Sequence, residues 1–277
     1  NDGKFAAFML NEEADKLISL KSDINAMFNS PILGYNSKEG IVYQFWANRD
    51  SHDVNYFDPK TDYAPTTAIS SVSWDDSNFP NIEGFGVWAA KCNFTMGPDG
   101  KMYSRMLGGN LVRIDVENAR GENLTNGDLV GTKDGSAYGL VFDPQDENVF
   151  YFSNNDKHCI YKYDLRTKEW ACWAGQEGKS GYLDGPIGQA MFNKPGQMCV
   201  DSEGNIILTD TENHCIRKIT MSTGYVSTLA GKPQNSGYVN GSAEDAQFKK
   251  PLGICIDNDD VMYIGDSENR AIRRLAV

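Results

Sequence analysis

One long internal repeat constrains the fold of this chain more than any other feature. The stretch DTENHCIRKI begins at Asp210 and returns as DSENRAIRRL at Asp266, 56 residues later. The similarity extends upstream to Ala174 and Ala230, and the shared landmarks, such as Phe192 and Phe248, keep the same offset. A fixed period in this range indicates units that stack or radiate, because one unit cannot bury its apolar faces alone.

Each repeat unit reads as four short strands. The apolar runs QMCVD, NIILTD, CIRKIT and YVSTLAG follow Pro195, and the turn-forming groups DSEG, TEN and MSTG separate them. Short β-branched runs bounded by Gly, Asn, Asp and Ser are typical of antiparallel strands in a meander. Four such strands per repeat are the unit of a β-propeller, a blade.

Fainter copies of the unit begin at Tyr138, Cys92, Ile32 and Asp2. The sequence therefore predicts an all-β fold, a six-bladed β-propeller with four-stranded antiparallel blades in a single domain over residues 1–277. The expected blades are approximately 1–30, 31–84, 85–134, 135–191, 192–247 and 248–277. The first lacks its inner strand and the last its outer strand, so either the termini complete one blade together or the natural chain is longer. A two-sheet sandwich is the rival fold, against which the long period counts.

Composition narrows the function classes. The chain has 26 Lys and Arg residues against 38 Asp and Glu residues, a formal charge of −12, so we expect no nucleic-acid partner. No apolar run is long enough for a membrane span, and no signal peptide is visible at the start. The six cysteines lie mainly in apolar strand-like runs, which favours free buried thiols, although Cys159 and Cys172 could form a cross-strand pair if the register allows.

The units from Phe192 and Phe248 resemble the NHL repeat. The matching residues are Phe-Asn-Lys-Pro followed by CVDSEGNIILTDTENHCIRKI, with Gly253 at the expected glycine in the second unit and Gln197 replacing it in the first. The G-Y-x-x-G spacers are similar to those of bacterial, Bacteroidetes-like envelope NHL proteins, which often carry an immunoglobulin-like IPT/TIG domain ahead of the propeller. This resemblance implies a periplasmic, extracellular or cell-surface location and an additional domain N-terminal to this chain.

A candidate binding face follows from the meander. The long connections 175–193 and 231–249 are expected on the same face as the turns between second and third strands, and loops on a rigid scaffold commonly carry function. The candidate ligand-binding residues are Tyr182, Asp184, Tyr238, Asn240, Asp210, His214, Asp266, Arg270 and His158.

Each of these residues also has a structural interpretation. Asp210 and Asp266 recur, which favours a role in bonding the turn backbone. His158 and His214 could bind a metal or stabilise turns, and a zinc site would need three converging histidines. The tyrosines could pack between blades or stack on a ligand.

The sequence thus favours a non-catalytic module that binds a glycan or protein through its loop face, without a cofactor or a metal. The alternative is a metal-dependent hydrolase or lyase with its site in the central channel. The resemblance to NHL-like amidating lyases, which hold zinc with histidines, supports this alternative. The chain contains only three histidines, and its expected inner strands carry few carboxylates for calcium.

Overall fold

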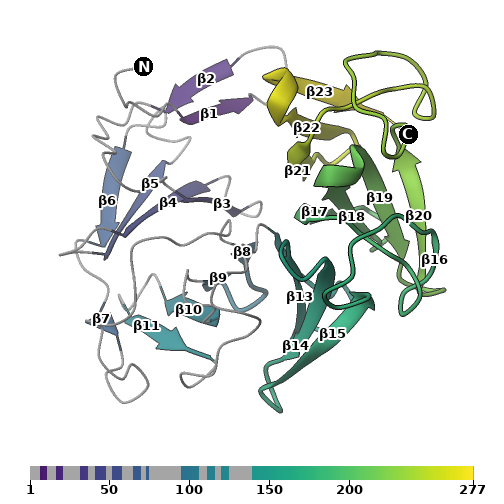
Figure 1. The fold of residues 1–277 in the computed structure, drawn as a ribbon. Coiled ribbons are helices and arrows are strands. Elements are labelled where there is room, and N and C mark those ends of the chain that lie inside the picture. Colours follow the sequence, from purple (N-terminus) through teal and green to yellow (C-terminus); the bar gives the residue numbers. More distant parts are fainter. Residues whose placement is uncertain are drawn as a thin grey trace. The chain divides into compact units, whose positions relative to one another are not determined.

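The computed structural model describes residues 7–10, 17–20, 32–36, 41–47, 52–57, 65–69, 73–74, 95–105, 111–115, 120–124 and 139–276. The chain divides into two compact units, Asn1–Leu129 and Val130–Val277 (Figure 1).

The described strands of the first unit form three sheets. One is the pair β1 (Ala7–Leu10) and β2 (Leu17–Leu20), and the next is the antiparallel meander β3 (Ile32–Asn36), β4 (Ile41–Ala47), β5 (His52–Phe57) and β6 (Pro65–Ile69). The third has the order β7-β11-β10-β9-β8, with β7 (Ser73–Trp74), β8 (Thr95–Met96), β9 (Met102–Arg105), β10 (Leu111–Asp115) and β11 (Arg120–Asn123). The expected blade boundaries near residues 30, 84 and 134 lie outside the described residues.

The second unit contains the clearest repeats, in three sheets. The first sheet is β12 (Leu140–Phe142), β13 (Val149–Asn154), β14 (Cys159–Asp164) and β15 (Glu169–Gly175). The second has the order β16-β20-β19-β18-β17, with β16 (Gly185–Pro186), β17 (Pro195–Val200), β18 (Ile206–Asp210), β19 (Cys215–Thr220) and β20 (Tyr225–Ala230). The third is β21 (Pro251–Ile256), β22 (Met262–Asp266) and β23 (Ala271–Leu275). Two single-turn 3₁₀ helices, η2 (Thr211–Asn213) and η3 (Ser267–Asn269), join β18 to β19 and β22 to β23.

The hairpin turns use the polar residues that the sequence places there. In the turn between β17 and β18, the Asp201 carboxylate accepts the Asn205 backbone N–H at 2.7 Å, and Gly204 has a positive φ of 81°. The next repeat uses Asp257 in the same way, and Asp260 adopts the left-handed conformation at φ 59°. Aspartate tolerates this region better than most residues, which explains why a turn without glycine keeps the same shape.

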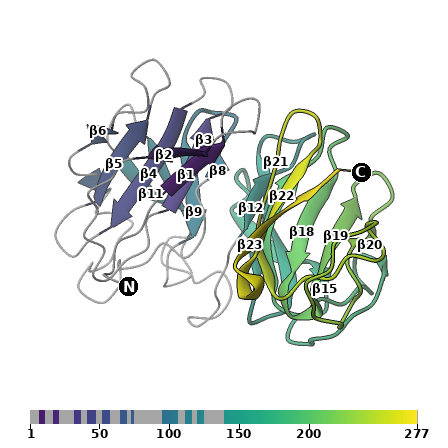
Figure 2. The same cartoon turned by 90° about the horizontal axis from the view of Figure 1, so that it is seen from above.

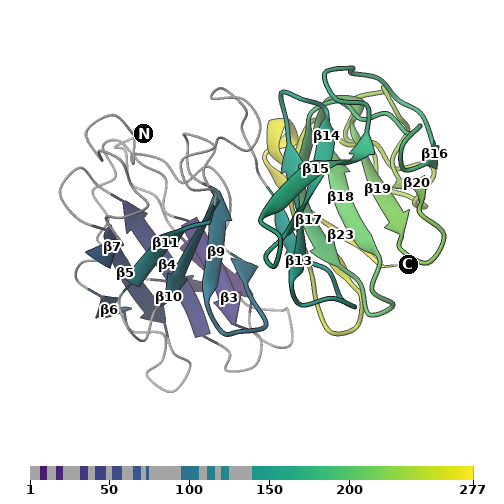
Figure 3. The same cartoon turned by 90° about the horizontal axis from the view of Figure 1, so that it is seen from below.

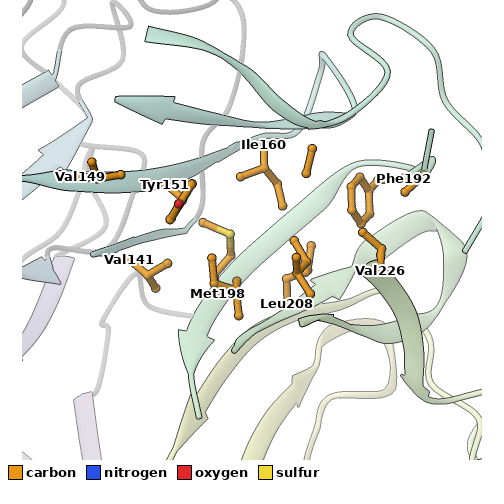
Figure 4. Close-up of a cluster of buried hydrophobic side chains, with 12 residues drawn as sticks. Val141, Val149, Tyr151, Ile160, Phe192, Met198, Leu208 and Val226 are labelled. Atoms are coloured by element: carbon orange, nitrogen blue, oxygen red, sulfur yellow. The ribbon is translucent and has the colours of Figure 1, made fainter. Parts of the chain in front are cut away.

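The sheets of the second unit pack face to face in sequence order. The first strands β12, β17 and β21 contact one another in series, and Figure 2 shows β18, β19 and β20 side by side behind β21 and β22. The core between the first two sheets includes Tyr151, Ile160, Phe192 and Leu208, all buried, with Met198 among them (Figure 4). Each sheet thus covers its neighbour's apolar face, which is the physical reason for the repeat.

The predicted fold class is confirmed as an all-β structure of antiparallel, propeller-type sheets. The expected strands of the 56-residue unit match β17 to β20 closely. The long connection 175–193 differs from the prediction in one respect, since it contributes β16, which pairs with the edge of β20 (Figure 3). The count of six blades stays a prediction. Within the described part of the chain, no helix has the length and apolar character to cross a membrane.

Candidate functional site

A fully buried arginine lies behind the first long connection. Arg217 projects from β19, and its Nη1 donates to the Met191 carbonyl at 3.1 Å and to Asp210 at 2.7 Å. Its Nη2 donates to the Leu183 carbonyl at 3.0 Å and to the Asp184 carboxylate at 2.6 Å. The Arg217 side chain therefore binds the loop both near its tip and near its end. The planar guanidinium is suited to donating four hydrogen bonds in fixed directions.

The turn of η2 completes this cluster. Asp210 is fully buried, and its Oδ1 accepts the Asn193 backbone N–H at 2.7 Å. Its Oδ2 accepts from Asn213 Nδ2 at 2.8 Å, and the same amide donates to the Gly181 carbonyl at 2.8 Å. Burial raises the pKa of Asp210 to about 6, even though Arg217 and these hydrogen bonds favour the ionised form. The pair is therefore ionised at neutral pH, and every oxygen of the carboxylate is engaged by the protein.

Two aromatic rings enclose the guanidinium. The Arg217 Cζ atom lies 4.9 Å from the Tyr182 ring centroid and 5.2 Å from that of Phe192. Both distances are within the range of cation–π contacts. We use "the Arg217 cluster" for Arg217 with Asp184, Asp210, Asn213, Tyr182 and Phe192.

The next repeat reproduces the cluster around Arg273. Arg273 donates to the Gln247 carbonyl at 3.0 Å, to Asp266 at 3.0 Å, to the Val239 carbonyl at 2.7 Å and to Asn240 Oδ1 at 2.7 Å. The neutral Asn240 thus replaces the charged Asp184, and the rest of the geometry is kept. In these two repeats the recurring D-x-x-N-x-x-x-R motif therefore fixes the repeat's own long loop.

The histidines connect neighbouring sheets. His158 Nδ1 accepts the Lys194 backbone N–H at 3.1 Å, and His214 Nδ1 accepts the Lys250 backbone N–H at 3.2 Å. Both histidines adopt the left-handed backbone conformation, at φ 56° and 59°, and Arg270 in the last repeat does the same at φ 53°. Burial, with a contribution from Lys194, lowers the pKa of His158, which favours the neutral ring that can accept this bond.

The tips of the two loops differ in exposure, although their sequences align. Tyr238 is 62% exposed, whereas the Tyr182 hydroxyl is hydrogen-bonded to Thr228 Oγ1 of β20 at 2.7 Å. The Asp184 carboxylate likewise accepts the Thr228 backbone N–H at 3.2 Å. The strand β20 therefore covers the first tyrosine. We use "loop tips" for residues 182–184 and 238–240.

The structure sorts the nine candidate residues into two groups. Asp210 and Asp266 are buried, and Asp184, Tyr182, His158 and His214 are half-buried with protein partners, as the preceding contacts show. The exposed group contains Tyr238, Asn240 and Arg270.

Sequence reasoning missed the arginines and two aliphatic tip residues. Arg217 and Arg273 looked like surface charges on a strand, and only their recurrence at the repeat offset could have marked them. Leu183 and Val239 are 46% and 43% exposed. Their position beside the recurrent tyrosines was the available signal.

Acidic and basic side chains lie side by side near the turns η2 and η3. Lys250 Nζ lies 3.3 Å from Glu212 and 3.1 Å from Glu268, which are contributed by η2 and η3. Among the residues that the structure describes, no group of three or more His, Cys, Asp or Glu side chains has the arrangement of a metal site. The described loop tips present exposed tyrosine, aliphatic and amide side chains.

The fold consists of antiparallel, propeller-type sheets, and two successive repeats carry the arginine motif. The family model described as the NHL repeat matches residues 192–219, the segment from Phe192 through β17, β18 and most of β19.

Known proteins extend this likeness over most of the chain. The protein SUPPRESSOR OF QUENCHING 1, chloroplastic, of Arabidopsis thaliana is 25% identical over 269 residues, which cover 90% of this chain and 25% of the plant protein. A solved Bacteroides thetaiotaomicron protein of unknown function is 20% identical with a TM-score of 0.76, covering 99% of this chain and 66% of that one. An auxiliary nutrient binding protein from the same organism is 21% identical with a TM-score of 0.72, covering 97% and 63%. The chain thus spans a quarter of the curated relative and just under two thirds of the solved structures.

Proposed function

We propose that this chain is a non-catalytic binding module that recognises a protein ligand through its loop tips. The observation that carries the proposal is the combination of exposed tip side chains with a buried arginine that fixes the loop behind them. Preorganised loops lose little conformational entropy on binding, so a small number of exposed contacts is sufficient for useful affinity. The similarity to a protein described as nutrient binding supports a binding role.

The chemistry of the tips favours a protein over a glycan. Tyr238 supplies a large amphipathic surface of the kind enriched at protein interfaces. Leu183 and Val239 are aliphatic, and they bury area against another protein but offer no ring face for sugar stacking. The experiment below distinguishes a protein ligand from a glycan ligand.

Location at a bacterial cell envelope and a preceding domain are further parts of this proposal. They rest on the resemblance of the G-Y-x-x-G spacers to envelope NHL proteins. They would be checked by fractionation of the native organism and by sequencing the complete gene.

The test uses two exposed tyrosines from the described part of the chain as a matched pair. Tyr238 at the loop tip and Tyr225 at the start of β20 are 62% and 47% exposed. The parent chain, Tyr238→Ala and Tyr225→Ala are each applied to immobilised peptide and glycan arrays. We expect peptide binding that is lost in Tyr238→Ala and kept in Tyr225→Ala.

Other outcomes of this test contradict the proposal. Binding confined to the glycan array would show that the ligand is a glycan. Equal loss of peptide binding in both variants would show that the loop tips are not the binding site. Metal-dependent turnover that disappears in His158→Ala would favour the hydrolase or lyase alternative instead.

A further inference from the structure

An Asn-Gly pair lies at the tip of the second long loop. Asn240 and Gly241 are both exposed to solvent. The residues on either side are anchored, since Val239 exchanges backbone hydrogen bonds with Gln247, and the Ser242 carbonyl accepts two backbone N–H groups from the turn that follows. Of the hydrogen bonds that the structure gives for residues 231–276, none has the Gly241 N–H as its donor. The peptide between Asn240 and Gly241 therefore lies between two fixed points and is open to water.

The chemistry of this pair favours intramolecular deamidation. In that reaction the backbone nitrogen of the following residue attacks the carbonyl carbon of the asparagine side chain, and glycine has no Cβ to hinder the approach. A Cβ atom built at position 241 would have Asp245 Cβ as its nearest neighbour, at 3.6 Å. The space around the Gly241 backbone is therefore open, and its nitrogen is free to move toward the Asn240 side chain.

An arginine holds the carbonyl oxygen that this reaction would charge. Arg273 Nη2 donates to Asn240 Oδ1 at 2.7 Å. The guanidinium is fixed in place, because it is 8% exposed and its Nη1 lies 3.0 Å from the buried Asp266 carboxylate. Attack at Asn240 Cγ places negative charge on Oδ1, the atom that the guanidinium already contacts. A preorganised cationic donor at a developing oxyanion stabilises the transition state.

The preceding repeat shows that the product of deamidation fits such a site. Asp184 occupies the position equivalent to Asn240 and also precedes a glycine. Its Oδ1 lies 2.6 Å from Arg217 Nη2, the same donor atom that Arg273 directs at Asn240. The two arginine sites therefore differ in the charge of this one partner, and an aspartate at position 240 would form an ion pair with Arg273 in the geometry that Asp184 already adopts.

We propose that Asn240 is a site of spontaneous deamidation, in which the Gly241 nitrogen is the nucleophile and Arg273 stabilises the oxyanion. Solvent base removes the Gly241 N–H proton, the nitrogen forms a bond to Asn240 Cγ, and the Cγ–Nδ2 bond breaks. The leaving Nδ2 group takes a proton from solvent and departs as ammonia. Water then adds to Cγ of the succinimide ring, and the bond from Cγ to the Gly241 nitrogen breaks. One asparagine and one water thus become one aspartate and one ammonium ion, with no oxidation or reduction.

Arg273 also directs the second step. Water can open a succinimide at either carbonyl, and opening at the main-chain carbonyl gives isoaspartate, in which the chain runs through Cγ. Because the guanidinium contacts the oxygen on Cγ, it favours addition of water there, and aspartate is the expected main product. The second long loop then carries the same carboxylate–arginine pair as the first. This modification adds one negative charge at a loop tip and does not depend on the proposed ligand.

The test incubates the folded chain at mildly alkaline pH and follows residue 240 by proteolysis and mass spectrometry. The same chain unfolded in guanidinium chloride is the reference without the Arg273 contact, and Asn240→Asp provides the standard for the aspartyl peptide. We expect the Asn240 amide to be lost several-fold faster in the folded chain than in the unfolded chain, with aspartate exceeding isoaspartate. Asn235 is exposed in the same loop but precedes serine, and we expect it to stay unchanged over the same period.

Gly241→Ala is the matched control variant. The φ angle of Gly241 lies outside the left-handed region, so alanine fits the backbone and leaves the bond between Asn240 and Arg273 in place. Its methyl group hinders the nitrogen, and we expect the amide to be lost several-fold more slowly than in the parent. The proposal is overturned if the folded parent loses Asn240 no faster than the unfolded chain, if isoaspartate predominates in the folded chain, or if Gly241→Ala reacts as fast as the parent.

Discussion

Replacing Arg217 by methionine is the most direct perturbation of the buried cluster that fixes the first loop. Methionine fills much of the space of the aliphatic stem but supplies no donor. Four acceptors lose their partner at once, namely the carbonyls of Leu183 and Met191 and the carboxylates of Asp184 and Asp210. Asp210 is left fully buried without its cation.

The expected cost follows from the burial of this pair. Removing one partner of a buried ion pair typically lowers the free energy of unfolding by about 3–5 kcal/mol, because the remaining charge stays buried without compensation. The added change Asp210→Asn removes that charge and keeps an acceptor for the Asn193 N–H. We expect the double variant to recover about 0.5–3 kcal/mol relative to Arg217→Met, the range seen for residues in direct contact.

Urea unfolding followed by tryptophan fluorescence measures these free energies, provided that the dependence on denaturant is unchanged among the variants. Arg273→Met is the matched control in the next repeat. Its arginine is 8% exposed and faces the neutral Asn240 in place of Asp184, so a smaller loss is expected. A cost below about 1 kcal/mol for Arg217→Met, the level of an exposed ion pair, would refute the argument. So would a double variant less stable than Arg217→Met.

Two further predictions concern the pH dependence of stability and the backbone of the first long loop. The pKa of His158 is lowered in the folded chain, so the stability that its neutral ring contributes is complete above about pH 6.5, the ordinary histidine pKa, and declines as the pH falls below it. We expect the His158→Asn variant to lack this decline when the free energy of unfolding is measured against pH. Gly175→Ala would place a Cβ atom 2.9 Å from the Phe192 ring on a backbone with φ +91°, and should lower the free energy of unfolding by about 2–4 kcal/mol. Gly178→Ala, at φ +76° in open space, should lower it by about 1 kcal/mol. Equal losses in thermal unfolding would contradict the contact between residue 175 and Phe192.

The sequence predicted the repeat architecture because its signals are local. Alternating β-branched residues and Asp-Gly or Asn turns determine β17 to β20 without reference to the rest of the chain. The expected bonding of Asp210 to the backbone of its own turn differs from the structure, in which Asp210 accepts the backbone N–H of Asn193 in the long loop and the side chain of Asn213.

The remaining features depend on contacts that have no local signal. Arg217 lies at a strand position where a charged residue usually faces water, and its complete burial arises from a loop more than twenty residues earlier in the chain. The different exposure of Tyr182 and Tyr238 depends on whether a strand such as β20 lies beside the loop. In the sheet β12–β15, Asn154 and Tyr161 occupy the positions of the aspartate and arginine, which is why the motif weakens there.

The self-contained Arg217 cluster defines what can be recombined between repeats. All the side chains of the Arg217 cluster come from the same 56-residue segment, Ala174 to Leu229, and Arg273 and its partners come from the next one. Transfer of the loop alone into another repeat would leave a buried guanidinium without its matching acceptors. Transfer of the whole segment would bring the arginine and its acceptors together. Exchange of complete segments would therefore keep each buried guanidinium with its own acceptors while the exposed tip residues change.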